Sequence, residues 1–385
     1  MKVVIAPDSF KESLSARHVA EAIAAGLITS DPAVQAVALP MADGGEGTLE
    51  AIIQGASGRF FTASVVDALG RPCQARWGWL EPETAVIEMA SAAGLEQIAP
   101  ADRDIMRAST RGVGQLVRHA LDHGAKRIIL TAGGSATNDA GAGMLVELGL
   151  KLLDQDGRHL SPHPQDLQRL ARLDDSSLDA RVHDVQWVIA TDVDNPLCGP
   201  QGASAVFGPQ KGASSAQVEM LDDILCKFAK LSEQILGQKF KDMAGAGAGG
   251  GFGFAALAWL GAHIEPGAQM VAKLIRLESH IKDCDLVITG EGRMDGQTLH
   301  GKAPMLVMQI AKRHGKPVVA IAGSLGDGYQ ALYAHGLTAA FSLVSGPMSL
   351  QDACVNAGNL LKQRAVDIMR LIRLSPGVQK AHQRS

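Results

Sequence analysis

The fold is decided at the start of the chain, which reads MKVVIAPDSFKESLSARHVAEAIAAGLITSDPAVQAVALP over residues 1–40. The apolar run at residues 3–6 predicts a buried strand. Ser15 then precedes a helical segment in which Val19, Ile23 and Leu27 share one face, as expected for a capped amphipathic helix. Residues 34–39 predict the next strand. A strand–helix–strand unit of this kind indicates a parallel sheet with a right-handed crossover.

Short apolar segments of the same kind recur along the chain. They lie at residues 128–130, 188–190, 286–289, 318–321 and 340–344. Most of them precede glycine or acidic residues, and several are followed by helical patterns. The sequence therefore predicts an α/β protein whose polar loops gather at the carboxyl ends of its strands.

The length of 385 residues suggests two domains of roughly 100–200 residues each. Residues 60–90 differ from the rest, because their short strands have little helix between them. Strands like the first one return near residues 285–344. We therefore expect residues 1–62 plus 280–375 to form a Rossmann- or flavodoxin-like domain with a parallel sheet. Residues 63–279 are expected to form a second, mixed α/β domain.

Composition excludes several classes of partner. A net charge of -4 and an aromatic content of 4% argue against nucleic acid and against an anionic membrane surface. Residues 244–263 lack charge over 20 positions, but seven of them are glycine, which disfavours a membrane span. We expect a cytoplasmic protein, because the N-terminus runs straight into a strand without a signal peptide. The five scattered cysteines indicate reduced thiols and neither a disulfide framework nor a zinc site.

Two early loops carry candidate site residues. In the first, APDSFKES at residues 6–13, Asp8, Ser9 and Lys11 could bind a small polar substrate or a phosphate; the alternative is a simple helix entry. In the second, PMADGGEGT at residues 40–48, Asp43 and Glu46 stand among glycines at a predicted helix start. That loop is either a tight turn or an anion site in which Asp43 steers a metal or a hydroxyl group.

A third loop follows the strand at residues 286–289 and reads GEGRMDGQTLHGK over residues 290–302. It places Glu291, Arg293, Asp295, Gln297 and Lys302 within a dozen residues, a mixture of charges that suits a phosphate and metal site. Residues 296–302 nearly match a P-loop. The next residue is alanine, where serine or threonine should bind Mg²⁺, so we interpret the match as accidental, although Lys302 could still touch phosphate.

The segment TAGGSATND at residues 131–139 precedes a predicted helix of small residues. Free amides at that helix N-terminus predict a phosphate cradle, with Ser135, Thr137 and Asn138 as side-chain donors. Close packing of helix against sheet is the alternative. Farther along, Asp192 and Asp194 could converge on Mg²⁺ or simply flank a turn.

Lys211, in the segment FGPQKGA at residues 207–213, is a possible phosphate contact. The glycine-rich stretch at residues 244–253 contains GxGxxG, but a dinucleotide fingerprint needs a strand directly before it. The charged residues 237–243 do not predict one. We therefore expect a flexible nucleotide-facing or hinge loop.

Together these segments resemble the bacterial type-1 glycerate kinase family over about residues 1–370. The resemblance rests on APDSFKESLS (6–15), ADGGEGT (42–48), GGSATND (133–139), DVDNPL (192–197), VFGPQKGA (206–213) and GEGRMDGQT (290–298). Three positions depart from the family pattern. Ala140 stands where glycine is expected, Gly296 where serine is usual, and Ala244 where proline often precedes the glycine-rich loop.

The resemblance implies ATP-dependent phosphorylation of D-glycerate at its 2-hydroxyl, with Mg²⁺. It also implies an active site in a cleft between two α/β domains. Phosphorylation at the 3-hydroxyl, an NAD-dependent oxidoreductase and a non-catalytic sugar-acid sensor are the alternatives. We expect a monomer or a homodimer whose partners are D-glycerate and ATP.

The resemblance also implies roles for individual residues. The catalytic candidates are Asp43, Asp192, Glu291, Arg293 and Asp295, and Asp192 and Glu291 are also the candidate metal ligands. Substrate would be bound by Asp8, Ser9, Lys11, Gly44, Gly45 and Gln297. The nucleotide would be bound by Gly133, Gly134, Ser135, Thr137, Asn138 and Lys211. Either Asp43 or Asp295 could be the base that accepts the hydroxyl proton.

Overall fold

The computed structural model describes residues 1–299 and 303–373. The chain forms two compact units. Unit 1 comprises Met1–Asp43, Glu50–Ala56 and the described part of Ala268–Ser385, and unit 2 comprises Gly44–Leu49 and Ser57–Gly267. The chain therefore leaves unit 1 and returns to it. The domain limits given above from the sequence stay a prediction.

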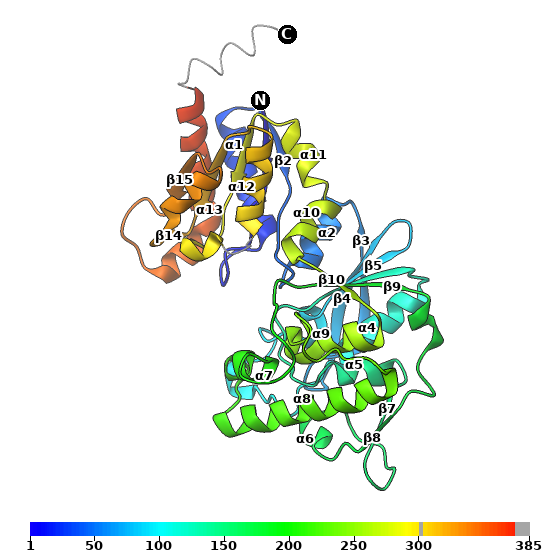
Figure 1. The fold of residues 1–385 in the computed structure, drawn as a ribbon. Helices are drawn as coiled ribbons and strands as arrows, with labels where there is room; N and C mark the ends of the chain where they lie inside the picture. Colours follow the sequence, from blue (N-terminus) through cyan, green and yellow to red (C-terminus); the bar gives the residue numbers. More distant parts are fainter. Residues whose placement is uncertain (300–302, 374–385) are drawn as a thin grey trace. The chain divides into compact units, whose positions relative to one another are not determined.

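Unit 1 is built on a five-stranded parallel sheet (Figure 1). Its strands are β1 (Lys2–Ile5), β2 (Gln35–Ala38), β11 (Leu286–Thr289), β13 (Val318–Ala322) and β15 (Ala339–Ser342). Their order across the sheet is β2-β1-β11-β13-β15, so the order reverses between β1 and β11. This is the flavodoxin-like order, which confirms the predicted fold class. In such sheets ligands bind outside the carboxyl ends of the strands at the reversal point.

One face of this sheet is covered by α1 (Ala16–Ser30) and α13 (Leu350–Arg373), which lie side by side in Figure 1. The Ser15 hydroxyl accepts the His18 N–H (3.4 Å) and caps α1 as predicted. Val3 and Ile5 of β1 point into the same apolar core as Ile23 of α1. Alternation along the strands thus directs one set of side chains to this pair of helices.

The remaining elements of unit 1 are short by comparison. They are α2 (Thr48–Gly55), which begins in unit 2, α10 (Gly267–Leu274), α11 (Leu277–Lys282), α12 (Ala303–Arg313), and the short parallel pair β12 (Arg293–Met294) and β14 (Ser324–Leu325). Two 3₁₀ helices, η4 (Gly296–Leu299) and η5 (Tyr329–His335), complete the unit. The pair β12–β14 links the polar loops that follow β11 and β13.

Unit 2 holds a six-stranded mixed sheet, which confirms the predicted mixed α/β architecture. Its strand order is β10-β9-β6-β5-β4-β3, with bounds His263–Glu265, Gln186–Ala190, Arg127–Thr131, Thr84–Glu88, Pro72–Leu80 and Arg59–Val66. The strands from β5 to β10 run parallel, whereas β3, β4 and β5 pair antiparallel as successive hairpins. The distinct pattern at residues 60–90 marked these hairpins. A separate two-stranded antiparallel sheet pairs β7 (Lys151–Leu153) with β8 (Arg172–Asp174).

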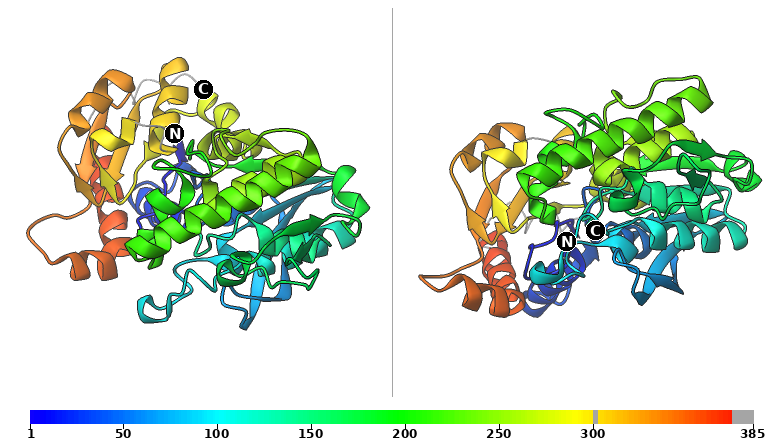
Figure 2. Two further views of the ribbon diagram at one scale, coloured as in Figure 1. Left: turned by 60° about the horizontal axis from the view of Figure 1, so that its bottom comes forward. Right: turned by 90° about the horizontal axis from the view of Figure 1, so that it is seen from below.

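The helices of unit 2 surround this sheet (Figure 2). They are α3 (Ala90–Ala93), α4 (Arg111–Asp122), α5 (Ala142–Glu147), α6 (Pro164–Leu167), α7 (Ala203–Phe207), α8 (Ser215–Leu236) and α9 (Ala248–Trp259). Ser214 and Gln217 form a capping box at the start of α8, the long green helix. Nearly all of α9 is buried inside the unit, which explains the charge-free stretch around it. No helix within the described residues is long and apolar enough to cross a membrane.

Candidate active site

A pocket of about 670 Å³ opens in unit 1 at the reversal point of the sheet. Asp8, Ser9 and Lys11 reach it from the loop after β1, and Glu291 and Arg293 from the loop after β11. Asp43, Gly323, Ser324, Leu343 and one side of α13 complete the lining. Parallel strands deliver all of these loops to one edge of the sheet, so residues remote in sequence share one pocket. Its volume suits a small-molecule site.

Two glycines allow the loops to approach each other. A Cβ at Gly290 would overlap the carbonyl oxygen of Ile321, and one at Gly323 would overlap the carbonyl oxygen of Gly292. The backbones after β11 and β13 can therefore lie in contact, and the Gly323 N–H donates to the Glu291 carbonyl (3.2 Å). Any larger residue at either position would separate the two loops that carry the charged groups.

The carboxylates of Asp8, Asp43 and Glu291 line this pocket and are close enough to interact electrostatically. Burial, with the nearby Asp43 and Glu291 carboxylates adding to it, raises the pKa of Asp8 to about 7. The opposing hydrogen bond from the Ser9 N–H to Asp8 Oδ1 is 2.6 Å long. Such crowding favours a proton or a cation among the three groups.

These carboxylates fit a magnesium ion that keeps water and substrate ligands. Within residues 1–299 and 303–373, none of the three belongs to a group of three potential ligand atoms lying within 4.8 Å of one another. A cation here would therefore take one or two carboxylates and complete its shell from water and phosphate oxygens. That is the usual habit of Mg²⁺, which seldom occupies an all-protein cage.

The loop after β11 holds its charged side chains in fixed positions. Thr298 donates its hydroxyl proton to Glu291 Oε1 (2.6 Å), and Arg293 Nε donates to Asp295 Oδ2 (3.0 Å). Glu291 is buried, whereas the Arg293 side chain is 69% exposed. Gln297 lies in η4 and Asp295 directly precedes it, and neither is among the residues that line the pocket. Lys302, the other candidate in this loop, lies outside the described residues.

Unit 2 brings two of the predicted glycine loops together. The Gly133 N–H donates to the Gly44 carbonyl (3.2 Å), and a Cβ at Gly133 would overlap the Cα of Gly45. Gly134, with φ 71°, is the exposed tip of the loop after β6. The two loops therefore form one glycine surface on unit 2, where a phosphate could approach the backbone closely.

Lys211 is buried beneath the loop after β6. Its ammonium donates to Ser135 Oγ (2.8 Å) and to the Thr137 carbonyl (2.7 Å). Burial lowers the pKa of Lys211 to about 7, against the smaller attraction of Asp139. Thr137 is fully buried as well, and Asn138 donates to Ser204 Oγ (2.9 Å) from a fully buried position. These three side chains hold the loop in shape from its inner side.

The expectation of free amides at the N-terminus of α5 is wrong. The Asp139 carboxylate accepts the N–H groups of Gly141 and Gly143 (3.1 Å each), and the Thr110 hydroxyl accepts the Met144 N–H (2.9 Å). These amides of the first turn thus donate to acceptors inside the protein and are not available to a phosphate. Ala140, which stands where the resemblance led us to expect glycine, adopts a left-handed φ of 55° at this turn. The backbone here does have the conformation that glycine prefers.

The glycine-rich stretch at residues 244–253, which runs into the start of α9, is not a flexible nucleotide-facing loop, because most of it is buried. Gly249, Gly250 and Gly251 all have left-handed φ values, and a Cβ at Gly250 would overlap the Thr137 carbonyl. The Gly250 carbonyl accepts the Ala140 N–H (3.1 Å). The stretch therefore supports the loop after β6 from within the core. Residues 237–247 contain no strand, so the requirement for a dinucleotide fingerprint is not met.

Asp192 and Asp194 follow β9 and are both exposed. Asp192 Oδ1 accepts the N–H of Gly267, the first residue of α10 (2.9 Å). Neither carboxylate belongs to a three-ligand group within the described part of the chain. The proposed metal role of Asp192 with Glu291 stays a prediction.

Several supporting residues escaped the sequence analysis. Thr298, Asp139 and Glu88 are buried polar groups. Thr298 donates to Glu291, Asp139 accepts the Thr110 N–H, and Glu88 Oε2 accepts the Leu49 N–H (2.8 Å). Their residue types are common in loops and strand ends. Asp139 and Thr298 did stand inside the quoted segments GGSATND and GEGRMDGQT, which was the available signal.

Fold and site together define an α/β protein with a small-molecule pocket. It has a charged pocket at the reversal point of one sheet and a glycine surface over a buried lysine in a second unit. Comparison with known proteins makes this specific: the model of the Glycerate kinase family matches residues 3–373, and the chain belongs to that family.

Relatives of known name support the assignment over almost the whole chain. A glycerate kinase of Bacillus subtilis (strain 168) is 46% identical, over 97% of this chain and 98% of its own. A protein of Escherichia coli (strain K12) named glycerate 2-kinase is 47% identical, over 92% and 93% respectively. A crystal structure from Salmonella typhimurium LT2, provisionally described as glycerate kinase 2, matches with a TM-score of 0.85 and 46% identity, covering 98% of this chain and 99% of that one.

Proposed function

We propose that the protein transfers the γ-phosphoryl group of ATP to the 2-hydroxyl of D-glycerate, giving 2-phospho-D-glycerate and ADP. One observation supports this most strongly: Lys11 and Arg293 share the unit 1 pocket with the carboxylates of Asp8, Asp43 and Glu291. Cations suit the carboxylate of glycerate, and carboxylates suit its hydroxyl groups. The name of the Escherichia coli relative supports the 2-position.

On the acceptor side, Lys11 and Arg293 bind the carboxylate of glycerate, and Ser9 and the neighbouring carboxylates orient its hydroxyls. We propose Asp43 as the base, because it lines the pocket and Asp295 is not among the lining residues. The 2-hydroxyl oxygen forms a bond to the γ-phosphorus as the bond to the β,γ-bridging oxygen breaks. Asp43 takes the hydroxyl proton, and ADP carries away the released electron pair.

On the nucleotide side, Gly133 and Gly134 allow phosphate oxygens to approach the backbone of unit 2. Gly44 and Gly45, predicted from the sequence to bind the substrate, pack against Gly133 and would contribute to the same surface. Lys211 shapes this surface through Ser135 and the Thr137 carbonyl. Bound Mg²⁺ would supply charge neutralisation between the phosphate oxygens. Glu291, in the unit 1 pocket, is the residue we propose to hold it, and Asp192, in unit 2, stays the second candidate that the sequence predicts.

The reaction itself is tested with purified protein, Mg-ATP and D-glycerate, with ADP release as the readout. Glycerate-dependent ADP production is expected, and its absence would refute the kinase proposal. Enolase added to the products separates the two positions, since enolase acts directly on 2-phosphoglycerate. A product that enolase ignores would assign phosphorylation to the 3-hydroxyl.

Arg293→Ala tests the acceptor side. We expect kcat/KM for D-glycerate to fall about 100-fold or more, the size typical of losing one charged group at a reacting centre. The exposed side chain makes no core contact, so the fold should persist in circular dichroism. Arg59→Ala is the matched control, because it removes an equally exposed arginine, paired with Glu81 on the surface of unit 2. An unchanged kcat/KM in Arg293→Ala would remove this residue from the site.

A further inference from the structure

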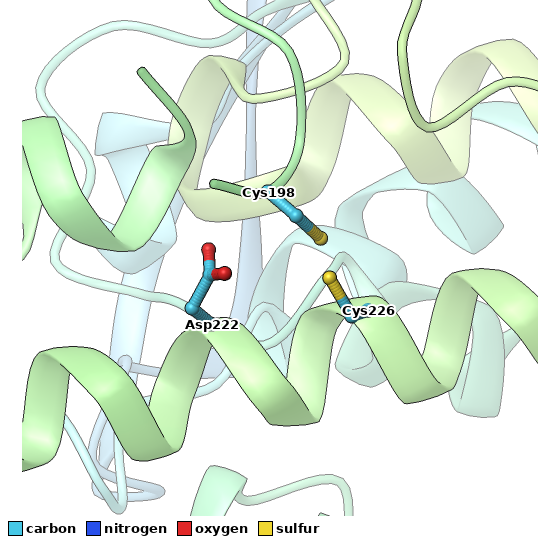
Figure 3. A group of neighbouring side chains, drawn as sticks. All are labelled: Cys198, Asp222 and Cys226. Atoms are coloured by element: carbon cyan, nitrogen blue, oxygen red, sulfur yellow. The ribbon is translucent and has the colours of Figure 1, made fainter. Parts of the chain in front are cut away.

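Three potential metal ligands converge in unit 2 outside the site described above. The Sγ atoms of Cys198 and Cys226 and a carboxylate oxygen of Asp222 all lie within 4.8 Å of one another. Asp222 and Cys226 are four residues apart on α8 and occupy one face of it, and Cys198 reaches them from the loop after β9 (Figure 3). The two sulfur atoms point toward each other.

The backbone holds this arrangement in place. Both carboxylate oxygens of Asp222 accept the N–H of Gly199 (3.0 and 3.1 Å), which anchors the residue next to Cys198 over α8. The close turn at this point also requires Gly202, because a Cβ there would lie 2.5 Å from the carbonyl carbon of Cys198. All three candidate ligands are half-buried, so an ion can reach them from solvent.

We propose that Cys198, Asp222 and Cys226 bind a thiophilic divalent cation of the Zn²⁺ class, with water in the fourth position. Two sulfur ligands select against Mg²⁺ and Ca²⁺, which prefer oxygen. Two sulfurs, one carboxylate oxygen and one water give the tetrahedral shell that Zn²⁺ favours. The sequence did not predict a zinc site, because no two cysteines are close together in the chain. The fold brings Cys198 and Cys226 together.

Binding is balanced by proton release. Each thiol loses its proton to solvent as its sulfur donates an electron pair to the ion, so two protons leave for each cation bound. The ligand set then carries three negative charges against the two positive charges of the ion. The Lys241 ammonium lies close enough to act on all three groups electrostatically. The bound ion would link the loop that carries Asp192 to α8.

The test uses full-length protein stripped of metal with a chelator and kept reduced. Titration with Zn²⁺ followed by calorimetry should give one equivalent bound, and the melting temperature should rise with Zn²⁺ concentration. Co²⁺ should give a thiolate-to-metal charge-transfer band. Cys226→Ser should weaken that band, because only the Cys198 thiolate remains, and should lower the affinity at least tenfold; Cys198→Ser/Cys226→Ser should abolish the band. Asp222→Asn retains an acceptor for the Gly199 N–H and should weaken binding while leaving the fold intact.

Cys73→Ser is the control, since Cys73 lies in β4 away from the cluster and should leave binding unchanged. Binding that survives in the double variant Cys198→Ser/Cys226→Ser would overturn the proposal. Absence of Zn²⁺ binding at micromolar concentration would do the same, as would a Cys198–Cys226 disulfide that persists in reductant. Metal binding is measured without glycerate or ATP, so its outcome is independent of the kinase assay.

Discussion

At the scale of single residues, Glu88 makes the stability of the protein depend on pH. It ends β5, is 6% exposed, and accepts N–H groups from Leu49 and Gly47. Burial is the dominant effect and raises the pKa of Glu88 from its ordinary value of 4.5 to about 7. Between those two pH values the folded protein binds more protons than the unfolded chain. The contribution of Glu88 to the free energy of unfolding therefore falls as pH rises from about 4.5 to about 7.

Glu88→Gln should remove this pH dependence and keep the acceptor for the Leu49 N–H. As pH rises from about 4.5 to about 7, we expect the free energy of unfolding of the wild type to fall relative to that of the variant. The difference should reach about 3 kcal/mol near pH 7. Urea unfolding at several pH values between 4.5 and 7.5 measures the difference. Glu96→Gln, at an exposed position of the same unit, should follow the wild-type profile. Parallel profiles for wild type and Glu88→Gln would show that folding does not raise the pKa of Glu88.

At the scale of elements, the contact of α1 with α13 depends on Gly26. A Cβ there would overlap the Lys362 carbonyl oxygen and lie 2.7 Å from the Ala365 Cβ. Gly26→Ala should thus destabilise unit 1 by about 1–3 kcal/mol, although alanine has the better helix propensity. Gly358→Ala in α13 is the matched substitution, because its Cβ would meet nothing within 4 Å and should stabilise by up to about 1 kcal/mol. The urea unfolding midpoints of the two variants, each compared with wild type, distinguish these outcomes. A higher midpoint in both variants would mean that α1 and α13 can move apart at little cost.

At the scale of the whole molecule, the proposed function divides the substrates between the two units. Lys11 lines the unit 1 pocket, and Lys211 supports the glycine surface of unit 2. Lys11→Ala should raise KM for D-glycerate about tenfold or more, the effect of one lost charge-assisted hydrogen bond, with little change in KM for ATP. Lys211→Met should raise KM for ATP with little change in KM for D-glycerate, because it loosens the loop after β6. Steady-state kinetics with each substrate varied decides, and equal effects on both KM values would contradict the division.

Much of the fold followed from local patterns. The apolar runs marked β1, β6, β9, β11, β13 and β15, Ser15 marked the start of α1, and the change of pattern near residue 60 marked the hairpins. These features depend on periodicity and capping, which act over a few residues. The loops after the strands were predicted as well, because glycine and charged residues at strand ends are local signals.

Other features depend on contacts between remote segments and could not be read locally. Asp139 occupies the amides that the pattern of small residues suggested were free, and the glycines at 249–251 support a loop more than 100 residues earlier. The near P-loop at residues 296–302 proved to lie beyond the strand end, partly outside the described residues. The residues near each of these positions would be the same whichever remote segment contacts them, so the contact could not be predicted from the local sequence.

The sequence by itself determined the alternation of strands and helices, the polar strand-end loops and the family, because these depend on residue order and short-range spacing. Only the tertiary structure decided which loops share the unit 1 pocket and which backbone groups remain accessible near Gly134. It also decided that Cys198 meets Asp222 and Cys226. The physical reason is that burial, electrostatic crowding and ligand geometry depend on distances in space, which the parallel crossovers and helix packing set between segments far apart in the chain.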